Sequence, residues 1–103
     1  AGYSLLVLAV GIASADSPLA SVDEQSNDLC DSHYMFTVHN NLTDSSVRAT
    51  VHVNWDKGSD EGSYDQVFTL APGETQSIAC TYDWPDVGFP LHRHASVVGA
   101  EQI

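Results

Sequence analysis

Two stretches in the middle of the chain alternate between apolar and polar residues, and this period of two is typical of half-buried β-strands. In 47–55 (VRATVHVNW) the odd-numbered positions are Val, Ala, Val, Val and Trp, while the even-numbered positions are polar. In 34–41 (YMFTVHNN), Tyr34, Phe36 and Val38 share one face. The turn-forming residues LTDSS lie between the two stretches, so we expect these strands to pair antiparallel.

Turn signals divide the rest of the chain into further strands and connections. The expected strands are 66–71, 75–82 and 91–99, and the expected connections are a glycine- and acid-rich loop at 56–65 and a segment with Pro and Gly at 83–90. Pro72 and Gly73 predict a type II turn. Five strands, with no convincing helical period after residue 16, predict an all-β fold, a small antiparallel immunoglobulin-like β-sandwich with an apolar N-terminal extension.

The stretch VFTLAPGETQSI (67–78) resembles the strand–turn–strand of extracellular immunoglobulin-like and CARDB-type modules, in which F-x-L-x-P-G-E joins two adjacent strands. This resemblance implies a fold class and a surface location, and it implies no activity. An immunoglobulin-like sandwich usually has seven strands or more, so five leave it short. Donor-strand and pilin-like filament subunits fill such a shortage with a segment from a neighbouring subunit.

The first fifteen residues, AGYSLLVLAVGIASA, contain no charged side chain. They resemble the end of a secretory signal peptide, with Ala13-Ser14-Ala15 as the cleavage pattern, and they are too short for a membrane-spanning helix of about 20 apolar residues. A third interpretation keeps them as an assembly element, added to a neighbour as a strand or coiled in a filament core. We favour the third, whose contacting side chains would be Tyr3, Leu5, Leu6, Val7, Leu8, Val10 and Ile12.

All of the charge lies in the remainder of the chain, where 14 Asp and Glu oppose 3 Lys and Arg and give a net charge of −11. Such a surface repels phosphate backbones and anionic membranes, so a nucleic-acid partner is excluded. It also keeps a protein soluble and attracts cations, which could bind between subunits. The G-x-S-x-G, H-E-x-x-H and phosphate-loop motifs are absent from the sequence, so we expect neither an enzyme nor a cofactor.

The two cysteines, Cys30 and Cys80, are 50 positions apart and form no C-x-x-C motif. A single disulfide is the most economical interpretation, and two unpaired core thiols are the alternative. In the chain-entropy model this bond contributes about 4 kcal/mol, comparable with the whole stability of a small domain. A disulfide predicts an oxidising compartment, so we expect a secreted, extracellular or cell-surface protein.

Histidines are the first candidates for metal ligands. If the two central strands pair, His39 and His52 lie on the polar face within one diagonal step of each other. His92 and His94, two positions apart on the last expected strand, also share a face. Copper or zinc binding would require such pairs on adjacent strands, and solvated histidines on strand faces are the more common situation.

The acidic stretch 56–65 is a second candidate, because calcium prefers several oxygen ligands and Asp56 and Asp60 could supply them. The stretch does not follow the EF-hand pattern, so a solvated acidic turn is the simpler interpretation. Asn41 begins an N-x-T sequon, which makes it a candidate for glycosylation in an exported protein.

Five aromatic residues gather near the expected strand ends and in the 83–90 connection, namely Trp55, Tyr64, Tyr82, Trp84 and Phe89. Facing solvent, they would suggest carbohydrate or partner binding. At the edges of a small core they would need no such role.

These expectations divide the chain into an apolar segment (1–15), a polar linker (16–33, with a short strand around 19–22) and a β-sandwich domain (34–103). They favour a structural subunit of an extracellular filament, whose partners are copies of itself and which does not span the membrane when assembled. The alternative is a monomeric secreted binding module that retains its signal peptide.

Overall fold

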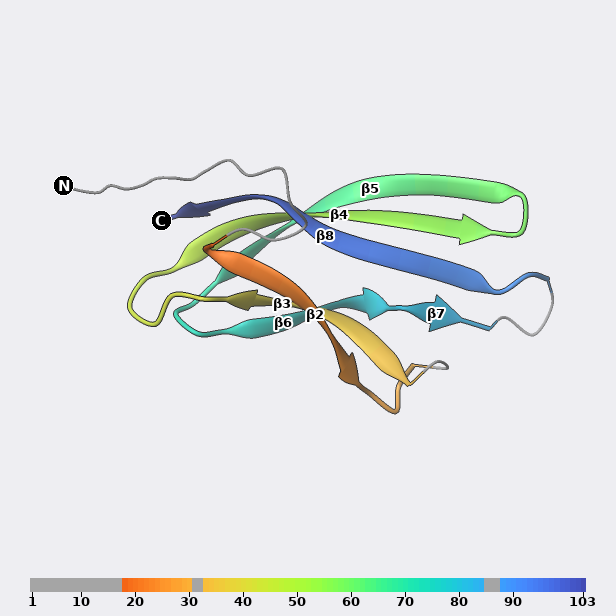
Figure 1. Ribbon diagram of the computed structural model, residues 1–103, viewed down its shortest axis with the longest axis horizontal. Coiled ribbons are helices and arrows are strands. Elements are labelled where there is room, and N and C mark those ends of the chain that lie inside the picture. Colours follow the sequence, from red (N-terminus) through yellow and green to blue (C-terminus); the bar gives the residue numbers. More distant parts are fainter. Residues whose placement is uncertain (1–17, 31–32, 85–87) are drawn as a thin grey trace.

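The computed structural model describes residues 18–30, 33–84 and 88–103, which form two antiparallel sheets (Figure 1). The three-stranded sheet has the order β2 (Ala20–Ser26), β3 (Tyr34–Asn40) and β6 (Thr75–Cys80). The four-stranded sheet has the order β5 (Asp60–Leu70), β4 (Val47–Lys57), β8 (Leu91–Gln102) and β7 (Tyr82–Asp83). The expected all-β sandwich is therefore confirmed, while the apolar extension lies outside the described residues.

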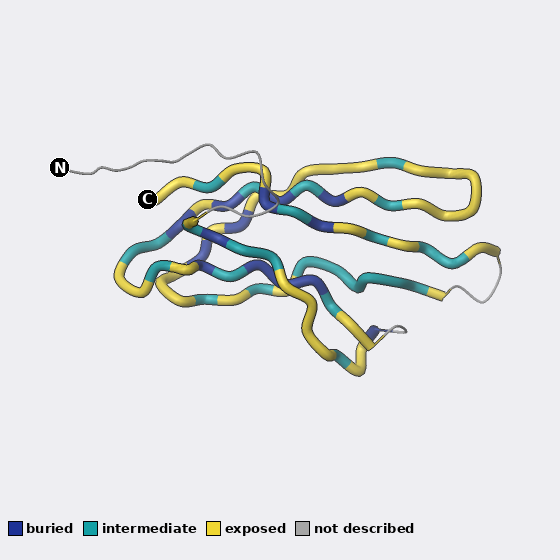
Figure 2. The backbone as a smooth tube through the Cα atoms, viewed as in Figure 1, coloured by how far each residue is buried: buried dark blue, intermediate teal, exposed yellow. Residues whose placement is uncertain are grey.

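The core lies between the two sheets and follows the alternation seen in the sequence. Val47, Ala49, Val51 and Val53 of β4 are completely buried. The sheets supply the rest of the buried cluster, namely Ala20, Phe36, Val38, Phe68, Leu70, Ala95 and Val97. Each buried valine or larger side chain of this cluster contributes about 1.5–3 kcal/mol. Figure 2 shows the buried residues, in dark blue, on strands of both sheets.

The expected pairing of the two central strands is wrong. β3 pairs with β2 and β6, and β4 pairs with β5 and β8. The chain between β3 and β4 crosses from one sheet to the other, and the buried side chain of Asn40 holds this crossing. Its amide nitrogen donates to the carbonyl oxygens of Ser45, Leu70 and Ala71.

The expected loop at 56–65 is also wrong, because these residues form the end of a long β-hairpin. Lys57 pairs with Asp60 across a two-residue turn at Gly58 and Ser59. Gly58 has a φ of 65°, a conformation that favours glycine in tight hairpins. The beginning of β5 is mostly exposed on both faces, so it carries no apolar period from which a strand could be predicted.

Two other segments differ from expectation in length. The expected linker 16–33 contains β2, which pairs with β3 from Ala20 opposite Asn40 to Ser26 opposite Tyr34. The expected strand 75–82 is divided at Thr81, whose N–H donates to the carbonyl oxygen of Tyr34 while its own carbonyl accepts from the N–H of Arg93. The chain thus passes at Thr81 from the smaller sheet to the larger one.

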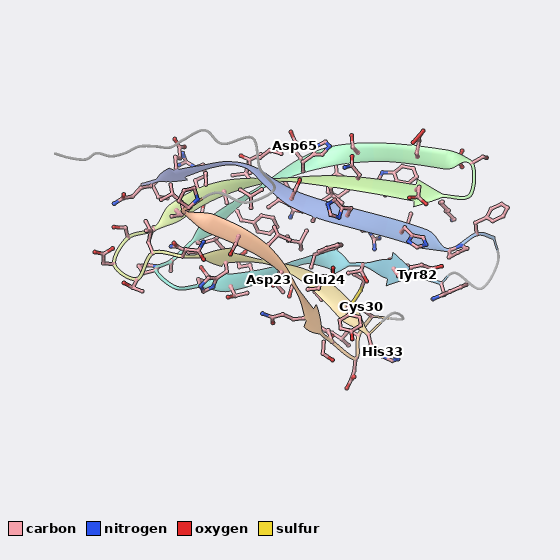
Figure 3. All side chains as sticks on the ribbon, viewed as in Figure 1. Asp23, Glu24, Cys30, His33, Asp65 and Tyr82 are labelled. Carbon is pink, nitrogen blue, oxygen red and sulfur yellow. A yellow bond between two sulfur atoms is a disulfide. The ribbon has the colours of Figure 1, made fainter. Side chains whose placement is uncertain are left out.

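The expected disulfide between Cys30 and Cys80 is present, with the two Cα atoms 5.5 Å apart. It connects the loop between β2 and β3 to the end of β6, close to the point where β7 begins (Figure 3). The bond therefore anchors a surface loop to the place where the two sheets meet.

The tip of the β4–β5 hairpin and the first half of β8 extend beyond the three-stranded sheet (Figure 1). With β7 alongside, they form a part of the larger sheet that we call the projecting half, comprising residues 54–63, 82–84 and 91–94. The projecting half contains no completely buried side chain, unlike the part of the larger sheet that faces the three-stranded sheet (Figure 2). Its polar side chains are available to solvent and to ligands.

Candidate functional site

A groove with a volume of about 350 Å³ lies on the projecting half. Its lining comes from three adjacent strands, β5, β4 and β8, and consists of Asn54, Trp55, Asp56, Glu61, Gly62, His92, Arg93 and His94. A volume of this order is at the lower end of the range of small-molecule sites.

Strand register aligns four of the side chains at this site in one row. Tyr82 is opposite His92, His92 is opposite Asp56, and Asp56 is opposite Glu61. Directly opposite residues project from the same face of a sheet, so the row crosses all four strands. Trp55 and the buried residues of β4 project from the other face, toward the side of the core.

The two carboxylates in this row are neighbours of equal charge. Like charges directly opposite each other on a sheet are destabilising. Within the described part of the chain, no ion pair or side-chain hydrogen bond involves Asp56 or Glu61. Their oxygens are therefore free acceptors, and a ligand that donates hydrogen bonds would relieve the repulsion between them.

The aromatic rings of Tyr82, Trp84 and His92 lie at the β7 end of the row. The ring of Tyr82 is 4.0 Å from that of His92 in an edge-to-face arrangement and 4.8 Å from that of Trp84 in a tilted one, measured between centroids. Trp84 remains 58% exposed. These contacts hold the rings in place beside the groove, which makes them a fixed apolar surface. Figure 3 labels Tyr82 at the start of β7.

The next row places His94 opposite Asn54. The ring of His94 also meets the core residue Phe36 edge-on, with centroids 6.1 Å apart and planes at 89°. His94 thus lies where the groove meets the edge of the core. Its contact with Phe36 restricts the ring, whereas the amide of Asn54 can donate as well as accept hydrogen bonds.

On the reverse face of the sheet, behind the groove, Gly62 lies opposite Trp55. A Cβ atom at Gly62 would be only 2.7 Å from Cζ2 of the Trp55 ring, so a larger residue would displace the indole. Arg93 lies opposite Trp55 and projects from the same reverse face, where its guanidinium donates to the carboxylate of Asp83 at 2.6 Å and to the carbonyl of Cys80 at 3.0 Å. The groove is therefore attached to the disulfide region through Arg93.

His52 and Asp65 form an ion pair next to the groove, with Nδ1 and Oδ1 2.6 Å apart. The other ring nitrogen, Nε2, is 3.1 Å from Oδ1 of Asn54. The hydrogen bond to Asp65 is the main reason why the pKa of His52 is raised above its usual value. A protonated ring donates from both nitrogens, which suits two oxygen partners.

The histidine candidates do not combine as the sequence suggested. His39 lies on β3 in the smaller sheet, with Nδ1 2.7 Å from the hydroxyl oxygen of Thr75, and His52 lies on β4 in the larger one. Their expected proximity is wrong because the two strands do not pair. His92 and His94 do share a strand, and they line the groove together.

Metal binding gains no geometric support from the described residues. Among them, no group of three or more His, Cys, Asp or Glu side chains is arranged to hold a metal ion. Asp56 and Asp60, the expected calcium ligands, are on opposite strands of a hairpin instead of in a loop. Asn41 is exposed directly after β3, and its glycosylation stays a prediction.

Sequence reasoning missed Asn54, Glu61 and Arg93, all of which line the groove. Asn54 and Arg93 lie among the polar residues of β4 and β8, which cannot identify partners without the register, and Glu61 lies near the start of β5, where there is no apolar period. No helix in the described ranges is long and apolar enough to cross a lipid bilayer.

Comparisons of this chain with protein-family models, with curated proteins and with solved structures gave no match.

Proposed function

We propose that this protein is a structural subunit of an extracellular filament or cell-surface assembly, in which the apolar N-terminal segment of one copy adds to the sheet of another. The observation that carries this proposal is the outer edge of β5. Among the described strands β5 pairs only with β4, although it is 11 residues long. Long unpaired edges are templates for an added strand.

The direction of the backbone groups defines which residues would accept that strand. The carbonyl of Thr69 accepts from Nε2 of Gln76, so it faces away from β4. In an antiparallel pair alternate residues direct both backbone groups outward, which gives Val67, Asp65 and Ser63 the same orientation. Gln76 covers the Thr69 end, so the open edge runs over 60–67.

The negative charge of this edge favours an uncharged partner strand. Asp60, Glu61 and Asp65 place carboxylates along it, and these repel the same edge of a second copy. The N-terminal segment 1–15 carries no charge, so it can approach without that repulsion. Its residues 3–13 would extend over about 36 Å, more than the open edge requires.

Exposed apolar side chains give the added strand something to cover. Tyr64 and Val67 are 42% and 57% exposed, and they project from opposite faces of β5. A strand beside β5 would shield one of them on each face. The disulfide between Cys30 and Cys80 is consistent with the extracellular location that this proposal assumes.

The test compares the full chain with a variant lacking residues 1–15, using electron microscopy and size-exclusion chromatography with light scattering. Filaments or large oligomers are expected from the full chain and monomers from the truncated one. Equal behaviour of the two would overturn the proposal.

A pair of point variants tests the acceptor edge itself. Val67→Pro removes an outward N–H without removing a hydrogen bond to β4, so it should prevent assembly and leave the fold intact. Val67→Thr keeps the N–H and is the matched control. Assembly by both variants would exclude β5 as the acceptor.

The alternative is a monomeric secreted binding module. The groove on the projecting half is the specific observation that favours it, and a monomeric full chain that binds a ligand there would be its expected result.

A further inference from the structure

We infer that the groove on the projecting half is a binding site for a neutral carbohydrate. This inference is independent of the proposed assembly, because it concerns the face of the sheet and not the edge of β5. Fixed aromatic rings, Tyr82 and Trp84, lie beside a groove whose lining offers the free acceptors of Asp56 and Glu61.

The aromatic part provides the stacking surface. The C–H groups of one side of a sugar ring pack on aromatic rings, and Trp84 offers an exposed indole for this purpose. The contact of Trp84 with Tyr82, and of Tyr82 with His92, restricts these rings before any ligand binds. Binding to a preorganised surface loses less side-chain entropy.

The polar part provides the hydrogen bonds. Sugar hydroxyls donate to carboxylates, and both Asp56 and Glu61 have free oxygens in the same row as His92. Asn54 and His94 follow in the next row and can both donate and accept. A molecule with several hydroxyl groups on a compact frame matches this set.

Charge excludes the other classes of small ligand. The net charge of −11 and the two carboxylates repel phosphorylated compounds and acidic sugars. An apolar ligand would cover Asp56 and Glu61 without donating hydrogen bonds to them, which is costly. A bare divalent cation lacks a third carboxylate, histidine or cysteine in a suitable arrangement among the described side chains.

The size of the groove limits the ligand. A volume of about 350 Å³ accommodates one or two hexose units. Because the groove is open along the sheet, a longer chain could pass over it with one or two residues in contact. The site therefore fits a segment of a surface or matrix glycan.

Binding is tested by titrating the full chain with cellobiose, maltose, lactose and mannobiose, and by following tryptophan fluorescence and saturation-transfer NMR. Trp55 and Trp84 are the two tryptophans, and both belong to the site or its border. We expect saturable binding of at least one of these sugars at millimolar concentration. Absence of binding by all four would overturn the inference.

Variants distinguish this site from nonspecific stacking. Trp84→Ala should weaken binding about tenfold, as expected for the loss of one aromatic face, and Asp56→Asn with Glu61→Gln should weaken it further. Tyr64→Ala removes an exposed aromatic side chain from the other face of the same sheet and is the matched control. Equal affinity in the Trp84→Ala and Tyr64→Ala variants would contradict the proposal.

Charged probes separate the remaining explanations. A uronic-acid disaccharide of the same size as cellobiose should bind at least tenfold more weakly than its neutral counterpart, because of the carboxylates in the groove. Calcium chloride alone is the second probe. Calcium binding that requires Asp56 and Glu61 in a protein that binds no sugar would overturn the inference in favour of a cation site.

Discussion

Replacement of Asn40 by alanine tests whether the crossing between the two sheets is held by one side chain. Asn40 is completely buried, and its amide nitrogen lies 2.8, 3.2 and 3.0 Å from the carbonyl oxygens of Ser45, Leu70 and Ala71. Its Oδ1 accepts from the N–H of Leu42 at 2.8 Å. The two N–H groups of the amide are shared among three carbonyl oxygens and Oδ1 accepts one bond, and these contacts join β3, the β3–β4 connection and the end of β5.

The magnitude follows from these bonds. A typical hydrogen bond contributes about 1 kcal/mol net, and a buried polar group left without a partner costs about 1–3 kcal/mol. Alanine at Asn40 removes four contacts, three of which share two N–H donors, and leaves the N–H of Leu42 and the carbonyl of Ser45 without this partner. We therefore expect the free energy of unfolding to fall by about 3–4 kcal/mol, a large part of the 5–15 kcal/mol typical of a domain.

Urea denaturation followed by tryptophan fluorescence measures this change in the free energy of unfolding, and two further variants serve as comparisons. Asn40→Asp keeps the acceptor for Leu42 but sets a carboxylate against three carbonyl oxygens, so it should be less stable than Asn40→Ala. Asn41→Ala changes an exposed neighbour and should alter stability by less than about 1 kcal/mol. A loss below about 1 kcal/mol for Asn40→Ala, or a stability of Asn40→Asp equal to the wild type, would refute the reasoning.

Two other changes have outcomes that the structure defines. Joint replacement of Cys30 and Cys80 by alanine removes a link over 50 positions and should lower the free energy of unfolding by about 4 kcal/mol; an unchanged urea midpoint would show that this loop adds nothing. For His52, hydrogen bonding to Asp65 raises the folded-state pKa above the unfolded value. The protonated pair therefore stabilises the fold below about pH 6.5, and this contribution disappears as pH rises through the folded-state pKa. Asp65→Asn should abolish that pH dependence, which is measured by denaturation at several pH values, and should lower the His52 pKa, which is measured by NMR titration. An unaltered titration would show that Asp65 is not the cause of the raised pKa.

The parts of the fold that were predictable have local causes. The buried face of β4 follows from alternation alone, because one face of the strand packs in the core along most of its length. Pro72 and Gly73 form a turn as expected, with Gly73 at a φ of 71° and the N–H of Glu74 donating to the carbonyl of Ala71. The disulfide was predictable from an even cysteine count.

Strand pairing was not predictable, because it depends on interactions distant in sequence. The stretch LTDSS has the composition of a hairpin turn, and only the buried bonds of Asn40 show that it crosses between sheets. The hairpin at Gly58 was hidden because β5 has no apolar face near its start. An alternation of apolar and polar residues arises when one face of a strand is buried. Strands that are exposed to solvent on both faces lack this alternation and are difficult to predict from the sequence.

The candidate site depends on the same long-range register. A one-residue slip between β4 and β8 would move His92 and His94 to the other face of the sheet relative to Asp56. The register in fact shifts between Thr50 and Val51, where β4 meets β8, and this irregularity sets the row that joins Asp56 to His92. The histidine pair was therefore visible in the sequence, but its carboxylate neighbours were not.

The two proposed interactions use different parts of the larger sheet and can occur together, which leads to a further prediction. A strand added to the edge of β5 would lie beside Glu61 and would leave the face that carries His92 and Asp56 open. A filament would then repeat the groove once per subunit, so weak individual sites would act together on a glycan surface. If both proposals hold, the assembled chain should bind an immobilised neutral polysaccharide far more tightly than the Val67→Pro monomer does. Equal binding by the two would show that the sites act singly, whatever the sugar.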